Sequence, residues 1–149
     1  MSLLQKIDDD LRAAMKATEA EKVSVLRMAK AALKNKEIDK RDTLSDDDVY
    51  AVLSTLSKQR KESIEQFAKG GREDLAEKER RELSVLQSYL PRELTQEELD
   101  SIIAEAIRES SAGSPKDIGN VMRLVMPRVR GAADGKVVNQ RVRSLLEKM

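Results

Sequence analysis

Few residues of this chain have the type and spacing that catalysis requires. The sequence has neither His nor Cys, so it lacks the usual general base near neutral pH and the thiolate nucleophile. Two Ser–Lys pairs have i, i+4 spacing, Ser54 with Lys58 and Ser57 with Lys61. Because 37% of the residues are charged, such pairs arise by chance and are ordinary neighbours on a helix surface. We therefore expect no catalytic residue.

Two acidic runs, residues 8–10 and 46–48, have the residue type of metal ligands. Three consecutive residues of a helix point in three directions, so neither run can chelate one ion. The second run also suits a helix N-terminus, where the helix dipole favours negative charge. No glycine-rich phosphate loop is recognisable. We expect neither a metal nor another cofactor.

The charge of the chain is unevenly distributed. From residue 120 onward there are seven basic and two acidic residues, a net charge of +5, whereas the first 119 residues carry −4. A basic end predicts an anionic partner. The candidate contacts with nucleic acid are Lys116, Arg123, Arg130, Lys136, Arg141 and Arg143. The alternative is that these cations form only a solvated face.

The mode of any such binding follows from the missing aromatics. No aromatic residue follows Tyr89, so this end has no platform on which bases could stack. Nucleic acid would be held through its phosphates and its shape. Binding should then depend on salt and only weakly on sequence.

These side chains must be positioned by helices, because apolar residues recur with helical period along nearly the whole chain. Composition agrees, since the apolar residues are mostly Ala, Leu, Val, Ile and Met. We predict an all-α protein with a four-helix subdomain over 1–90 and a three-helix, tail-like subdomain over 91–149. Residues 39–42 are expected to be a loop, and Pro127 is expected to kink or end its helix.

Three helix starts are marked by capping residues. Ser45 and Thr95 each follow a leucine and precede an acidic first turn, and Glu98 completes a capping box with Thr95. Ser114 is followed by Pro115, which suits the first helical position.

One charged residue interrupts an apolar stripe. Arg60 lies on the helical face formed by Leu53, Leu56, Ile64 and Phe67. An antiparallel hairpin turning at residues 70–71 would bring Arg60 level with Glu82. We predict a structural, partly buried ion pair that specifies register more than it stabilises. The alternative is that Arg60 extends to solvent.

The first ten residues have no basic region and no long apolar run. They resemble neither a signal peptide nor a membrane span, so a cytoplasmic protein with no membrane contact is expected.

Several short motifs together resemble the bacterial YqeY-like family, over essentially the whole chain. They include Lys58-Gln59-Arg60-Lys61-Glu62-Ser63, Tyr89-Leu90-Pro91, Asp117-Ile118-Gly119-Asn120-Val121-Met122 and Gly131-Ala132-Ala133-Asp134-Gly135. The C-terminal half of this family is similar to the tail domain of the B subunit of the glutamine-dependent aspartyl/glutamyl-tRNA amidotransferase. The resemblance implies four helices followed by three. Asn120 departs from it, because the family usually has lysine there.

The leading hypothesis is a tRNA-associated binding module, or an accessory of tRNA-dependent amidation, in which amide passes from glutamine to misacylated tRNA. Its partners would be tRNA and a protein of the aminoacylation or amidation machinery. One alternative is a protein–protein adaptor that binds through the N-terminal hairpin. A further alternative, implied by the resemblance alone, is a carbon–nitrogen ligase with glutamine as amido donor; without a partner, we expect no catalysis.

Overall fold

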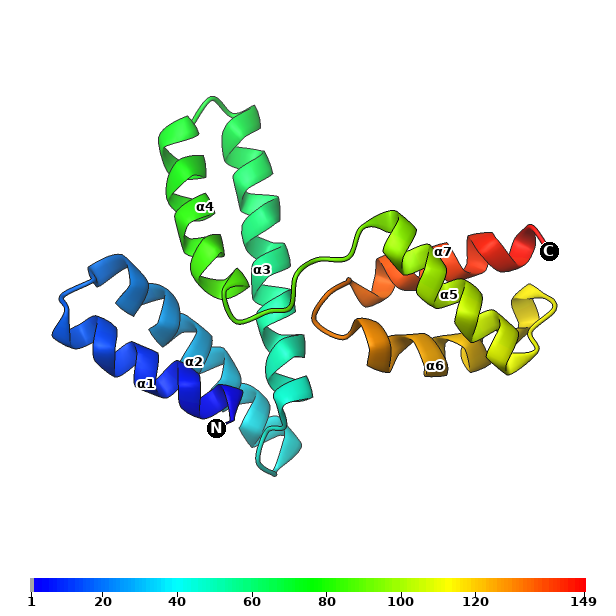
Figure 1. Ribbon diagram of the computed structural model, residues 1–149. Helices are drawn as coiled ribbons and strands as arrows, with labels where there is room; N and C mark the ends of the chain where they lie inside the picture. The colour runs from blue at the N-terminus through cyan, green and yellow to red at the C-terminus, as the bar shows by residue number, and fades with distance from the viewer. Residues whose placement is uncertain (1) are drawn as a thin grey trace. The chain divides into compact units, whose positions relative to one another are not determined.

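The computed structural model describes residues 2–149. Over these residues it contains seven α-helices, one short 3-10 helix and no strand, which confirms the all-α prediction. The helices are α1 (Leu3–Lys16), α2 (Ala20–Lys40), α3 (Asp46–Lys69), α4 (Glu73–Gln87), α5 (Gln96–Ser110), η1 (Pro115–Asp117), α6 (Ile118–Val129) and α7 (Gly135–Glu147) (Figure 1).

The chain divides into two compact units, each with its own core. The N-terminal unit, Met1–Pro91, holds α1–α4, and the C-terminal unit, Arg92–Met149, holds α5–α7. The first core is built around Leu26, Leu53 and Leu86. The second is built around Ile103 and Val125, which are fully buried. Each cluster removes apolar side chains from water within its own unit.

The N-terminal unit is organised by α3, its longest helix. The first half of α3 buries Val49 and Leu53 against α1 and α2. Its second half pairs with α4 as an antiparallel hairpin (Figure 1). The turn between them needs glycine, since Gly71 has φ of +75°. Ser45 caps α3 as predicted: its Oγ accepts from Asp48 N–H, and the Asp48 carboxylate accepts from Ser45 N–H.

The end of α2 differs from the prediction. Asp39 and Lys40 are helical rather than part of a loop, and the helix stops at Arg41. Arg41 adopts a left-handed conformation with φ of +58°, and its N–H donates to the Glu37 carbonyl. A left-handed residue after the last turn ends many helices, but it is usually glycine. Without that glycine the sequence carried no sign of this end point.

In the C-terminal unit, the predicted capping box of Thr95 and Glu98 is confirmed. Pro127 does not end its helix, because α6 continues through it to Val129. Pro127 lies in the last turns and removes only the donor to the Arg123 carbonyl. Arg123 and Pro127 are both exposed, so that side of the helix is open to water. The predicted start at Ser114 is a 3-10 turn before α6.

The Glu98 cap predicts a pH dependence. A hydrogen bond from Arg92, with another from the Thr95 N–H, lowers the pKa of Glu98 from 4.5 to about 2. A lowered pKa in the folded state stabilises the fold above pH 4.5, and this contribution is lost as the pH falls toward 2. Glu98→Gln keeps a side chain that can complete the box. Its unfolding midpoint should lie below that of the wild type at pH 7, and the difference should disappear near pH 2 in urea titrations. A difference that is constant with pH would contradict this assignment.

Candidate functional site

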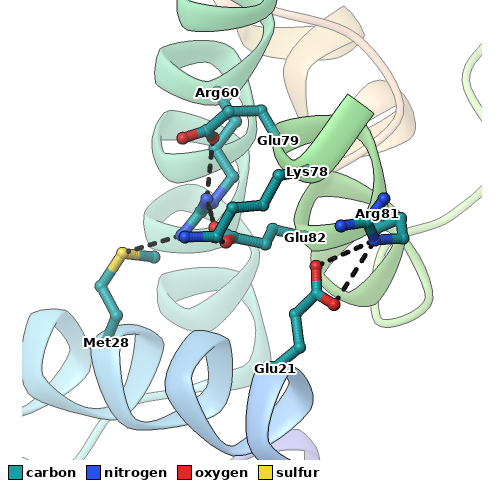
Figure 2. A network of polar contacts seen from close by, with 7 residues as sticks. All are labelled: Glu21, Met28, Arg60, Lys78, Glu79, Arg81 and Glu82. Carbon is teal, nitrogen blue, oxygen red and sulfur yellow. Dashed lines mark hydrogen bonds and ion pairs between the residues drawn. The ribbon is translucent and has the colours of Figure 1, made fainter. Parts of the chain in front are cut away.

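Arg60 stands at the centre of a partly buried polar network between α3 and α4 (Figure 2). Its Nη1 donates to Glu79 Oε2 at 2.8 Å and to Glu82 Oε2. The side chains of Arg60 and Glu82 are 12% and 11% exposed. The structure therefore places Arg60 against Glu82 and not in solvent.

The same guanidinium reaches a third helix. Its Nη2 donates to the sulfur of Met28 in α2 at 3.2 Å (Figure 2). A separate ion pair joins α4 directly to α2, between Arg81 Nε and Glu21 Oε1 at 3.1 Å. Sequence reasoning missed Glu79 and Met28. Glu79 could have been found, since it lies three residues before Glu82 on one helix face. The Met28 contact is tertiary and left no sign in the sequence.

The network is suited to fixing helices and not to catalysis. Its carboxylates are held by a cation, and it includes no nucleophile. Of the two Ser–Lys pairs, one is divided between the core and the surface: Ser57 is buried at 5% exposure while Lys61 is exposed. Among residues 2–149, no group of three or more acidic side chains is arranged to hold a metal ion.

The six candidate cations of the C-terminal unit differ in whether they already have an acidic partner. Arg141 in α7 makes a two-pronged contact with Asp100 in α5, Nε to Oδ1 at 2.7 Å and Nη2 to Oδ2 at 2.8 Å. This hydrogen bonding lowers the pKa of Asp100. Arg128, which was not a candidate, pairs with Glu109 at 2.7 Å. Arg141 therefore fastens α7 to α5, and a phosphate would have to compete with Asp100 for it.

Three other candidates lie on or beside the outer side of α6. Lys116, Arg123 and Arg130 are all exposed, and we call them the α6 basic face. The buried side of α6 is formed by Val121, Val125 and Val129. At 100° per residue, Arg123 points almost directly away from that side. Within residues 2–149, Lys116 and Arg123 have no ion-pair partner.

The remaining candidates are on α7. Lys136 and Arg143 are exposed and seven residues apart, so they share one face of the helix. Arg141 and Arg143 are two residues apart and point to opposite sides. Asn120 is exposed and lies one turn before Arg123 on the outer side of α6. A lysine there would extend the α6 basic face by one cation.

Comparison with known proteins gives the family. A family model described as Yqey-like protein matches residues 4–146. The chain belongs to the YqeY-like family. Curated relatives of this YqeY-like chain are named Altered inheritance of mitochondria protein 41, mitochondrial. The relative from Vanderwaltozyma polyspora is 44% identical over 54% of this chain and 44% of its own length.

Two longer matches have the same name. The relative from Kluyveromyces lactis is 36% identical over 73% of this chain and 60% of its own length. The relative from Pyrenophora tritici-repentis is 28% identical over 97% of this chain and 81% of its own length. The YqeY-like chain thus spans about half the length of the first of these relatives.

The comparison corrects one expectation. A cytoplasmic location was expected from the first ten residues, but the matched relatives are named as mitochondrial proteins. The prediction of a cytoplasmic protein is therefore wrong. The first residues of a chain report only on the segment they belong to. Within residues 2–149, no helix is long and apolar enough to cross a membrane.

Proposed function

We propose that this YqeY-like chain is a tRNA-associated binding module and that the α6 basic face is its contact with tRNA. The proposal rests on one observation: Lys116 and Arg123 are exposed cations without an acidic partner. A phosphate group can replace the water around them without first breaking an ion pair.

The chemistry of the face sets the mode of binding. The C-terminal unit contains no Phe, Trp or Tyr, so tRNA would be held by its backbone and not by stacked bases. Such contacts position a nucleic acid but do not read its sequence. The resemblance to the amidotransferase tail domain supports a role beside tRNA-dependent amidation, with the transfer of amide carried out by a partner.

The proposal is tested by titrating the full chain with labelled tRNA at increasing salt. Neutralising two or three phosphates should give a log–log slope of about −2 to −3, taking roughly 0.9 per contact. Two tRNAs of different sequence should give the same slope. Absence of salt-dependent binding to any tRNA would overturn the proposal.

A second candidate function is protein binding by the α3–α4 hairpin. A shallow hollow on the outer side of α3 surrounds the half-buried Phe67 and is lined by Gln59, Glu62, Ser63, Glu65 and Gln66. An apolar side chain surrounded by a polar rim is a common arrangement in protein–protein interfaces. This candidate becomes the better one if the tRNA titration fails.

A further inference from the structure

The segment of residues 22–41, which covers most of α2 and the residue that ends it, carries an excess of positive charge equal to that of the C-terminal end. Between residues 22 and 41 there are seven basic and two acidic residues, a net charge of +5. The N-terminal unit as a whole has 18 basic and 18 acidic residues. The excess on α2 is therefore cancelled only by acidic residues elsewhere in the unit.

Part of this charge lies in one row on the outer side of α2. Val25, Leu26, Ala29 and Leu33 form the buried side of the helix. Arg27 and Lys34 are exposed and seven residues apart, so they lie on one line along the helix. This line lies opposite the buried side. The two cations are about 10 Å apart along the axis. We call Arg27 and Lys34 the α2 basic row; Arg41, the left-handed residue that ends the helix, lies outside it.

The row differs from α3 and α4 in how its charges are used. Along α3 and α4 the cations pair with neighbouring carboxylates, namely Arg60, Lys69, Arg72, Lys78, Arg80 and Arg81. On α2, Lys30 at the edge of the row pairs with Asp8 at 2.9 Å. Within residues 2–149, Arg27 and Lys34 have no ion-pair partner. In a unit with equal numbers of acids and bases, these two cations remain open to an external anion.

The residues on the same line of the helix indicate the kind of anion. Ala31 and Ile38 lie in the line of the row, and Ile38 is 63% exposed. Neither side chain can accept a hydrogen bond, and the row contains no carboxylate and no aromatic ring. The small side chain of Ala31 allows close approach of an extended partner. Two unpaired cations on one line of a helix, with no carboxylate between them, fit a polymer with repeated negative charge.

We propose that the α2 basic row is a second binding surface, which takes the phosphodiester backbone of a double-helical nucleic acid. It is separate from the α6 basic face and does not rest on the function proposed for that face. The row would bind by charge alone, so it would not distinguish one sequence from another.

The test compares two double variants of the full chain. Arg27→Gln with Lys34→Gln removes two charges of the row, and glutamine is a good helix former at exposed positions. The matched control, Lys69→Gln with Arg80→Gln, removes two exposed cations that are already ion-paired. The probe is a short, fluorescently labelled RNA duplex, followed by anisotropy between about 50 and 200 mM salt. Circular dichroism melting verifies that each variant is folded.

The row variant should bind the duplex more weakly than the wild type, and its log–log salt slope should be shallower by about 1.8, since each phosphate that is no longer neutralised accounts for roughly 0.9. The control should keep the wild-type slope. The difference should persist when Lys116→Glu and Arg123→Glu are also present, because the row acts on its own. Equal slopes for the row variant and the control would overturn the proposal. So would a wild-type chain that binds phosphatidylglycerol vesicles through the row and leaves the duplex unbound.

Discussion

Arg60→Ala is expected to lower the free energy of unfolding by about 3–5 kcal/mol, because it strands the nearly buried carboxylate of Glu82. The loss comes from a charge left with only the exposed Lys78, 3.8 Å from Glu82 Oε1, to compensate it, and not from the value of the ion pair itself. Glu79 Oε2 also accepts from Arg60. Without that cation between them, the carboxylates of Glu79 and Glu82 repel each other. Urea denaturation of the full chain at neutral pH measures the effect.

Two further variants isolate the cause. Arg80→Ala removes an arginine of α4 that pairs with Glu73 and Glu77 at the surface, and it should cost less than about 1 kcal/mol. Replacing both partners with apolar residues, Arg60→Met with Glu82→Leu, should restore most of the stability removed by Arg60→Ala, since Glu82 is no longer a buried, unpaired charge. If Arg60→Ala costs no more than Arg80→Ala, the network is not buried in solution. If the double variant is as unstable as Arg60→Ala, poorer packing and not a stranded charge is the cause.

The Arg60 contact also shows what a sequence can predict about a fold of this kind. The turn at residues 70–71 and the apolar stripe of α3 set the register of one hairpin, and register alone placed Arg60 level with Glu82. The Met28 contact needed the angle at which α2 crosses α3, which no local pattern encodes. Helix types and capping boxes were predictable for the same reason as the hairpin, because each depends on residues a few positions apart.

Charge was harder to interpret than register. A net charge summed over a long segment hides a helix whose excess is offset by its neighbours, and this is why the cations of α2 escaped notice. Conversely, a sequence does not show which cations already have partners, and Arg141 is paired with Asp100. Asp100 lies 41 residues away in the chain. Only the packing of α7 on α5 brings the two together.

The α6 basic face predicts a second large effect. Reversing Lys116 and Arg123 together, Lys116→Glu with Arg123→Glu, should weaken tRNA binding by more than tenfold at low salt, because two attractions to phosphate are removed and two repulsions are added. The salt slope should fall by about 2 for tRNAs of different sequence alike. Folding should change little, since both side chains are exposed and without acidic partners.

The matched control for this prediction lies on the neighbouring helix of the same unit. Arg108 is exposed on the side of α5 that faces away from the buried Leu99 and Ile103, so Arg108→Glu makes the same change of charge as the single variant Arg123→Glu. Net charge is then equal in the two proteins, and only the position of the reversed residue differs. If tRNA recognises the α6 basic face, Arg123→Glu weakens binding several-fold more than Arg108→Glu. Equal losses would mean that tRNA responds only to the overall charge of the unit, and the α6 basic face would not be its binding surface.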